Sequence, residues 1–315
     1  MKFSRLHHWL LSLSCYLNRN LRYGNSKNRI FRFLVIRARS YLKKYIKRHT
    51  DEICQFGEKT IKLKYAGKLT LTLNDYIDRW LYTGADFEPH ILRLIIKILR
   101  QGDTFLDLGA NIGYFTIIAS NKIGEDGRVY SFEPNPQTLL KLKRNIALNQ
   151  KRNIVVYDKA VSNQKGEIYF NIPTATIKNS GRASIRPIEE NYHSIKVETA
   201  ILDELINELK PIRLIKMDIE GAEALALQGM VNIIERDRPY LIMELSDTYL
   251  KQLGSSAEEI IGFLRSKSYT IYLAGEEIIG IDNIVNLKEH QYDIFCIPQI
   301  HQKEGEKIIA SIFCD

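Results

Sequence analysis

The segment Gly102–Ser120 (GDTFLDLGANIGYFTIIAS) constrains the fold more than any other part of this chain. Thr104–Leu108 is a short apolar run with one carboxylate, Asp107, near its end. Gly109 and Gly113 then bracket a tight turn, after which an apolar, helix-compatible pattern resumes. A strand, a glycine turn and a helix in this order place helical N–H groups against a ligand outside the carboxyl end of the strand. The segment therefore predicts a nucleoside-binding βαβ unit.

The residues after this unit indicate which nucleoside it binds. A second apolar run, Val129–Phe132, ends in Glu133, where an acid can accept hydrogen bonds from a ribose diol. A dinucleotide fingerprint needs glycines at three positions, and here Asn111 and Tyr114 occupy the second and third. Asp107 would also repel a pyrophosphate. S-adenosylmethionine has no phosphate, and its ammonium, sulfonium and ribose all suit carboxylates.

Five sequence blocks in order resemble one family. They are LDLGANIGYFT, VYSFEPNP, RNIALN, KMDIEGAE and RPYLIMEL, and the similar stretch runs from about Glu88 to Pro298. Together they resemble the FkbM-type family of S-adenosylmethionine-dependent O-methyltransferases. The resemblance implies an α/β fold, the class I methyltransferase Rossmann-like doubly wound, seven-stranded, mostly parallel sheet with strand order 3-2-1-4-5-7-6. Ligand then binds at the carboxyl ends of the strands, near the switch point.

The predicted cofactor site combines the glycine turn with the ends of the next two strands. The third strand is predicted at Ile154–Tyr157, and many class I methyltransferases follow it with an acid that meets the adenine amino group. This chain has Ala160 at the aligned position, so adenine contacts are expected from backbone, with help from Asp158. The predicted cofactor-binding residues are Asp107, Gly109, Ala110, Asn111, Gly113, Tyr114, Glu133, Asp158 and Ala160.

A second acidic block, in Leu214–Glu220, is predicted to carry the acceptor chemistry. Period-two alternation places Lys216, Asp218 and Glu220 on one side of a strand. A buried lysine needs a partner, so Lys216 is expected to pair with one of these acids. Methyl transfer to a hydroxyl also needs a group that accepts its proton. Asp218 is the first candidate for this base, with Glu220, Glu244 and His193 behind it.

His193 is the only histidine expected near this chemistry, and it lies in a polar insertion, Pro173–Ser194, interpreted as an acceptor-side lid. A histidine suits proton removal from a hydroxyl, although one in a polar loop is more often a surface residue. No metal site is predicted. Asp218, Glu220, Glu223 and Glu244 are nevertheless oxygen ligands of the kind that Mg²⁺ prefers, and the alternative is that they pair with Lys216, Arg182 or Arg186.

The charge distribution predicts three parts. Residues 1–50 carry thirteen Lys/Arg and no Asp/Glu, although the whole chain has a net charge of only +8. They are expected to be a basic, helical extension, followed by a strand-rich lead-in segment at 51–87 with a hairpin around Ala66-Gly67 and by the methyltransferase domain at 88–315. The extension either lies on an anionic membrane surface or packs against protein. No nucleic-acid-binding module is visible.

Taken together, the sequence predicts a methyltransferase that uses S-adenosyl-L-methionine to O-methylate a hydroxyl of a saccharide, glycolipid or polyketide-like compound. An NAD-linked Rossmann oxidoreductase and a non-catalytic, membrane-associated scaffold are the alternatives. Four widely spaced cysteines and the lack of a signal sequence favour a cytoplasmic location, with peripheral membrane contact through residues 1–50 left open.

Overall fold

The computed structural model describes residues 10–17, 40–42, 44–65, 67–83, 87–174, 179–187, 190–206, 210–275, 277–281 and 291–312. The chain divides into two compact units. Unit 1 contains Met1–Lys62, Lys68–Glu88 and Lys178–Ser180, and unit 2 contains Leu63–Gly67, Pro89–Ile177 and Gly181–Asp315. The part of the predicted leader that falls in 1–9, 18–39 and 43 lies outside the described residues.

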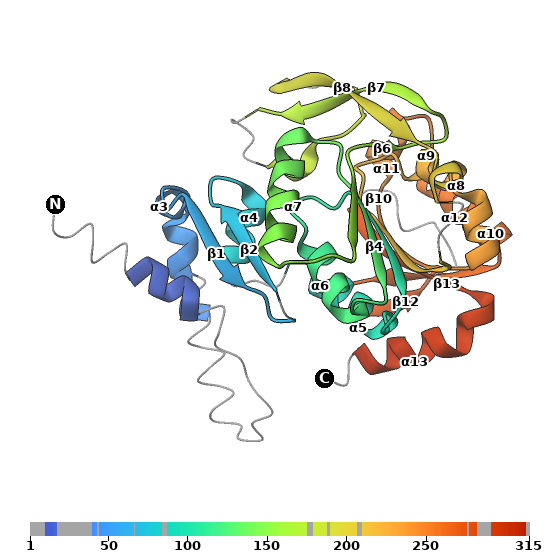
Figure 1. Cartoon of the computed structure of the whole chain (residues 1–315), viewed down its shortest axis with the longest axis horizontal. Helices are drawn as coiled ribbons and strands as arrows, with labels where there is room; N and C mark the ends of the chain where they lie inside the picture. The colour runs from blue at the N-terminus through green and yellow to red at the C-terminus, as the bar shows by residue number, and fades with distance from the viewer. Residues whose placement is uncertain are drawn as a thin grey trace. The chain divides into compact units, whose positions relative to one another are not determined.

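Unit 2 is built on an eight-stranded sheet with the order β12-β11-β13-β10-β9-β3-β4-β5 (Figure 1). Read from β5, this is the predicted order 3-2-1-4-5-7-6 with one additional edge strand, β12. Strands β5, β4, β3, β9 and β10 run parallel, and β13 is antiparallel to both of its neighbours. The predicted fold class is therefore confirmed. The strands are β3 (Thr104–Leu108), β4 (Arg128–Phe132), β5 (Ile154–Tyr157), β9 (Ile212–Met217), β10 (Tyr240–Ser246), β11 (Tyr269–Ala274), β12 (Ile278–Gly280) and β13 (Gln291–Pro298).

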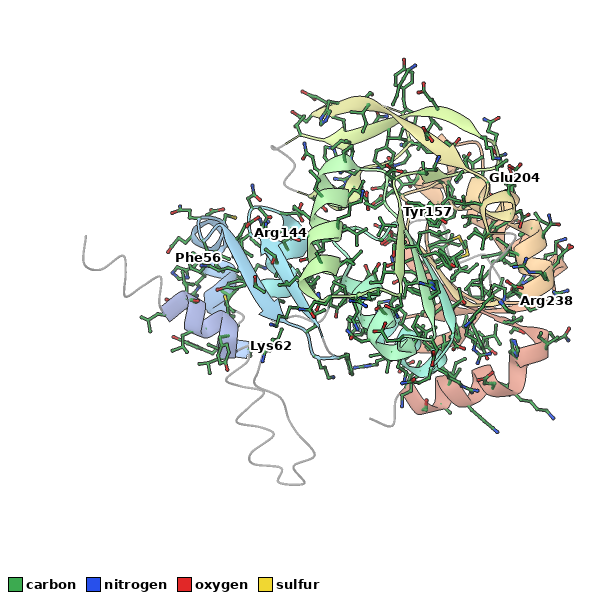
Figure 2. All side chains as sticks on the ribbon, in the orientation of Figure 1. Phe56, Lys62, Arg144, Tyr157, Glu204 and Arg238 are labelled. Carbon is green, nitrogen blue, oxygen red and sulfur yellow. The ribbon has the colours of Figure 1, made fainter. Side chains whose placement is uncertain are left out.

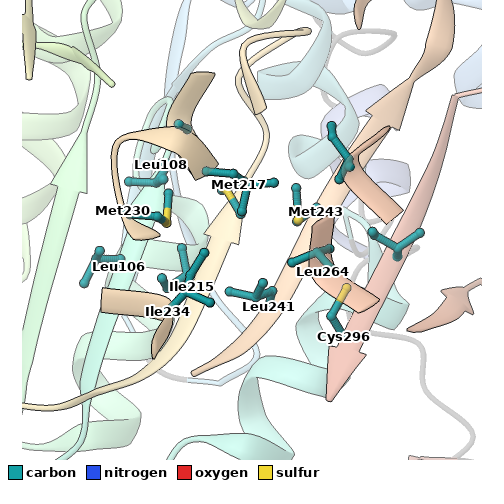
Figure 3. Close-up of a cluster of buried hydrophobic side chains, with 14 of the residues drawn as sticks. Leu106, Leu108, Ile215, Met217, Met230, Ile234, Leu241, Met243, Leu264 and Cys296 are labelled. Atoms are coloured by element: carbon teal, nitrogen blue, oxygen red, sulfur yellow. The ribbon is translucent and has the colours of Figure 1, made fainter. Parts of the chain in front are cut away.

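One face of this sheet carries a large apolar core, and Figure 3 draws part of it. Alternate residues such as Leu106, Ile215 and Leu241 leave the strands on this side and meet Ile234 and Leu264 from the covering helices, all of them fully buried. The helices of unit 2 are α5 (Pro89–Ile98), α6 (Tyr114–Ile123), α7 (Pro136–Leu148), α8 (Leu202–Leu205), α9 (Glu223–Gln228), α10 (Val231–Asp237), α11 (Asp247–Gln252), α12 (Ala257–Ser266) and α13 (Gln302–Ile312), with short 3-10 turns at η1 (Ser180–Arg182) and η3 (Gln299–His301).

Helices α5, α6 and α13 contact one another and cover the opposite face. The residues that alternate with the first core, including Phe105 and Tyr240, leave the strands on this second side. Phe132 and Tyr157 stack at the outer edge of the sheet with ring centroids 4.8 Å apart, and Figure 2 labels Tyr157 there. Both faces are thus closed by helices, as parallel strands require.

A separate three-stranded sheet has the order β6-β8-β7, with β6 at Ala160–Val161, β7 at Gly166–Pro173 and β8 at Tyr192–Ala200. One prediction was wrong here. The predicted Pro173–Ser194 loop ends earlier, because its last residues, including His193, pair with β7. The apolar residues of the alternating β7 sequence pack in a small separate hydrophobic cluster around Phe170 and Val197.

Unit 1 contains the predicted hairpin, with β1 at Glu58–Lys62 and β2 at Lys68–Thr72 in antiparallel register. Two short helices accompany it, α3 (Thr50–Cys54) and α4 (Tyr76–Tyr82). Residues 10–17 are helical, and the hydroxyls of Ser12 and Tyr82 lie 3.1 Å apart. Phe56, labelled in Figure 2, packs edge-on against Tyr82.

Among the residues placed by the structure, no helix is long and apolar enough to cross a membrane.

The C-terminal helix α13 is structural, although the sequence alone indicated nothing for this stretch. Glu304 from its first turn accepts hydrogen bonds from Arg100, Arg213 and Tyr240. Gly305 then allows close packing, because a Cβ atom there would lie 2.4 Å from Cδ1 of the buried Ile297 on β13. A position without a side chain therefore sets how closely α13 approaches the sheet.

Two helical glycines give a matched test of this packing. Gly305→Ala should lower the free energy of unfolding by about 1–3 kcal/mol, because the β-branched Ile297 cannot swing away from the new methyl group. Gly262→Ala, in the exposed middle of α12 with open space around its Cβ position, should instead stabilise by about 0.5–1 kcal/mol. Denaturant unfolding of both variants tests the pair, and equal effects of the same sign would contradict the packing argument.

Candidate functional site

The site begins with a row of polar side chains across the middle of the sheet. Strand register places Asp107 of β3 directly between Ser131 of β4 and Lys216 of β9. Thr116 of α6 donates a hydrogen bond to Asp107 Oδ2 at 2.5 Å, and its hydroxyl lies 3.0 Å from that of Ser131. Burial raises the pKa of Asp107, whereas nearby Lys216 lowers it. Asp107 is therefore a buried carboxyl oriented by its neighbours.

The turn after β3 uses its own amides internally. The N–H groups of Gly109 and Ala110 both donate to the Phe132 carbonyl at 3.0 Å, and that of Asn111 donates to Glu133 Oε2 at 2.9 Å. Gly109, Asn111 and Gly113 all have positive φ, which bends the turn tightly enough for these bonds. With these amides already bonded, the turn does not offer the N–H cradle that binds a pyrophosphate.

Glu133 lies at the end of β4 with 7% of its surface exposed. Its two carboxylate oxygens accept the N–H groups of Asn111 and Asn135, each at 2.9 Å. Burial raises the pKa of Glu133 to about 7 despite these bonds. Each oxygen keeps a lone pair for a further donor, such as a ribose hydroxyl.

Three buried polar atoms around this turn have no hydrogen-bond partner among the described residues: Asp107 Oδ1, Asn111 Oδ1 and Asn135 Nδ2. Buried polar groups are normally satisfied, so several orphans in one place indicate a ligand that completes their bonds. Two hydrogen-bond acceptors and one donor beside the Glu133 carboxylate would suit a polar nucleoside that carries no phosphate.

The second half of the site is an acid cluster that follows β9. Carboxylate oxygens of Asp218, Glu220 and Glu244 all lie within 4.8 Å of one another. Lys216 Nζ lies 3.2 Å from Asp218 Oδ2, which confirms that this buried lysine pairs with an acid. Strand β9 ends at Met217, so Asp218 and Glu220 follow the strand rather than continue its alternation. The side chains still converge because the loop turns back toward β10.

Crowding of like charges sets the protonation of this cluster. Burial and then the neighbouring Asp218 raise the pKa of Glu220 to about 8. Burial, the charge of Asp218 and a hydrogen bond with it hold the pKa of Glu244 far above its ordinary value. Glu244 therefore favours its protonated form near neutral pH, in which it can donate a hydrogen bond to Asp218.

Arg186 closes the cluster from the segment that precedes β8. Its guanidinium lies over the Tyr249 ring at 3.7 Å from the centroid, and Nη2 is 3.8 Å from Glu220 Oε2. Nε also donates to Ser184 Oγ at 3.0 Å, and only 2% of the residue is exposed. Arg182 Nη2 donates to the Tyr249 hydroxyl at 3.4 Å. Two cations in addition to Lys216 thus lie near the cluster.

A histidine that the sequence analysis overlooked reaches the same cluster. His90 Nε2, at the start of α5, lies 2.6 Å from Asp293 Oδ2 of β13, and Asp293 is the cross-strand partner of Glu244. The two residues are 203 positions apart. The available signals were weak: a histidine beside the proline that begins a helix, and one acid in an otherwise apolar strand. His193 was therefore not the only histidine to consider.

The remaining predicted residues lie as follows. Asp158 is exposed just beyond β5, and Ala160 packs in the small cluster of the three-stranded sheet. Tyr114 is buried at the start of α6. Glu223 accepts the N–H groups of Ile219 and Gly221, so it shapes the loop that carries Asp218 and Glu220. His193 is exposed on β8 opposite Ile172, and no contact found among the described residues joins it to the acid cluster.

Comparison with known proteins identifies the family that shares this arrangement. Residues 107–271, which span Asp107 through β11, match the Methyltransferase FkbM domain. The chain belongs to the FkbM methyltransferase family. Its cofactor is accordingly S-adenosyl-L-methionine, and the NAD-linked alternative is set aside.

Two relatives illustrate the range of the sequence similarity. The chain is 27% identical over 173 residues to hexuronic acid methyltransferase AglP of Haloferax volcanii, covering 54% of this chain and 67% of AglP. It is 25% identical over 147 residues to Methyltransferase 1 of Beauveria bassiana, covering 41% of this chain but only 59% of that protein. Among solved structures, methyltransferase FkbM of Methylobacillus flagellatus is 14% identical, with 90% of this chain and 58% of that one covered and a TM-score of 0.41.

The residues of the turn fit S-adenosylmethionine. Glu133 would hold the ribose, the orphaned atoms of Asn111 and Asn135 would meet polar groups of the nucleoside, and Asp107 would face its cationic end. When bound, the group supplies an electrophilic methyl carbon. The protein contributes carboxylates that favour a sulfonium over a neutral thioether.

This assignment predicts pH-dependent cofactor binding. A ribose diol donates more strongly to a carboxylate than to a carboxylic acid, so binding should lower the raised pKa of Glu133 and release a proton. Affinity should therefore increase as the pH rises from 6 to 8. Glu133→Gln should weaken binding by roughly 1.5–3 kcal/mol, about 10- to 150-fold, and flatten this dependence. Calorimetry in buffers of different ionisation enthalpy measures both effects, and unchanged affinity would refute the ribose assignment.

Proposed function

We propose that this FkbM methyltransferase O-methylates a saccharide hydroxyl, with Asp218 as the group that accepts the hydroxyl proton. The observation that carries the proposal is the carboxyl pair formed by Asp218 and Glu244. A sugar hydroxyl has a pKa far above 7, so its proton must be taken up as the new bond forms. A pair that holds one proton at neutral pH has one member ready to accept another.

The surrounding charges support this division of roles. Lys216 pairs with Asp218 at 3.2 Å, whereas no ion pair of Glu244 is found in the described part of the chain, and burial and the charge of Asp218 favour the protonated form of Glu244. The backbone also positions Asp218, because its N–H donates to the Leu108 carbonyl at 3.1 Å. Alignment of the acceptor oxygen with the methyl carbon, at about 3 Å, then supplies much of the rate enhancement.

A saccharide is favoured as acceptor by the polar lining and by one relative. Arg182, Arg186 and Tyr249 place cationic and hydroxyl donors beside the acids, a mixture that suits a polyhydroxylated compound. The similarity to a hexuronic acid methyltransferase points to the same class and to acidic sugars first. The two arginines would then meet the acceptor carboxylate.

An acidic sugar offers two oxygens for methylation, and the product distinguishes them. Methylation of a hydroxyl gives an ether that is stable in mild alkali, whereas methylation of the carboxylate gives an ester that hydrolyses. The first experiment incubates the protein with methyl-labelled S-adenosylmethionine and paired uronic-acid and neutral glycosides. We expect alkali-stable label in a saccharide. An alkali-labile label would show carboxylate methylation, and no labelled product from any glycoside would refute the proposal.

Asp218→Asn tests the base. The variant keeps the size of the side chain but cannot accept the proton, so turnover should fall by about 10²- to 10⁴-fold while cofactor affinity changes little. A carboxylate acceptor would need no base, since it is already ionised, and the variant would then retain much of its activity. Loss of cofactor binding would instead place Asp218 among the cofactor ligands.

His90 should act on the reaction through its partner Asp293. With the proton on Nε2, His90 donates to Asp293, so His90→Phe leaves that carboxylate uncompensated beside Glu244. An uncompensated charge raises the pKa values of the neighbouring acids, so the acid limb of the pH–rate profile should move to higher pH. His301→Phe, on a histidine that stacks on Tyr240, is the control and should leave the profile unchanged. Equal profiles for both variants would remove His90 from the proposed positioning role.

A further inference from the structure

Exposed apolar side chains concentrate in unit 1. Among the residues that the structure describes, eleven large hydrophobic side chains are exposed, and six of them belong to this smaller unit. These six are Leu10, Tyr16, Leu17, Tyr41, Tyr76 and Trp80. Single exposed hydrophobic residues are normal on a soluble domain, but a concentration in one small unit indicates a surface that contacts something.

Helix α4 shows the pattern most clearly. Tyr76 and Trp80 lie one turn apart with 45% and 41% of their surfaces exposed, and their rings are 5.7 Å apart. Leu81 and Tyr82 of the same helix are buried in unit 1. The helix therefore has an inner apolar side and an outer aromatic side. Paired tyrosine and tryptophan side chains, apolar with a polar edge, are typical of the interface between lipid and water.

Unit 1 has a large positive net charge. Its residues include 18 of the 45 Lys/Arg and 7 of the 37 Asp/Glu, a net charge of +11, whereas unit 2 carries −3. Two of the seven acids are buried: Asp78 accepts the Thr72 N–H, and Asp75 caps α4 through the Ile77 N–H. Several lysines of unit 1 are exposed, among them Lys44, Lys59 and Lys68. The net positive charge of unit 1 comes mainly from the thirteen Lys/Arg of residues 1–50.

We propose that unit 1 binds the surface of an anionic lipid bilayer. The lysines and arginines would be attracted to acidic headgroups, and Tyr76 and Trp80 would enter the headgroup region. Charge alone would also suit nucleic acid, but the exposed aromatic pair beside it favours a lipid surface. This binding is independent of the proposed methyl transfer, and it would concentrate the enzyme at a membrane.

The tryptophan content of the chain permits a direct test. There are two tryptophans, Trp9 and Trp80, so Trp9→Phe leaves Trp80 as the only tryptophan reporter. The full-length variant is titrated with vesicles of phosphatidylcholine alone and with vesicles containing roughly 30% phosphatidylglycerol. We expect a blue shift of Trp80 emission with the anionic vesicles only, and its reversal at high salt. Absence of a shift with anionic vesicles would overturn the proposal.

Substitutions distinguish binding through Tyr76 and Trp80 from nonspecific adsorption to vesicles. Tyr76→Ser/Trp80→Ser should reduce co-sedimentation with anionic vesicles several-fold, and the substituted positions already lie at the surface. Tyr169→Ser, on β7 of unit 2 with 63% exposure, is the matched control and should bind as the parent does. Equal loss in both variants, or binding to an RNA oligonucleotide with none to vesicles, would overturn the proposal. Thermal unfolding of each variant verifies that it is folded.

Discussion

The close approach of two backbone segments underlies the whole site. A Cβ atom on Gly109 would lie 2.0 Å from the carbonyl oxygen of Asp218, and the Asp218 N–H bonds to Leu108. The glycine turn after β3 and the loop that carries Asp218 and Glu220 therefore touch directly, at the carboxyl ends of β3 and β9. Any side chain at position 109 would push them apart. A glycine thus brings the proposed cofactor and acceptor groups into one site.

The carboxyl groups of Asp218, Glu220 and Glu244 lie close together in this site. Three features compensate for their proximity. Lys216 neutralises Asp218 from within the sheet, Arg186 approaches Glu220 from the other side, and Glu244 remains protonated. Removing one member would leave the others as uncompensated buried charges, which is costly. Burial and the charge of Asp218 also favour the protonated form of Glu244 beside it. The groups that compensate for burial would thus take part in the proposed proton transfer.

The two units divide the molecule by charge as well as by packing. Unit 2 is mildly acidic and carries the site, whereas unit 1 is strongly basic and carries an exposed aromatic pair. Electrostatics of this kind steer a protein toward a partner of opposite sign without altering its fold. A catalytic unit that binds a cationic cofactor has reason to remain acidic. A basic surface is then best placed on a different part of the chain.

Local patterns determined the parallel sheet, the glycine turn and the acids at strand ends, because alternation and strand–turn–helix punctuation act over a few residues. Family resemblance added the strand order, which the structure confirms with one extra edge strand. Tertiary structure alone decided the rest. It paired His90 with Asp293 across 203 positions, moved His193 from a loop to an exposed strand, and brought Arg186 onto Tyr249. These contacts join residues far apart in the chain, and no local pattern encodes which distant partners a folded sheet will bring together.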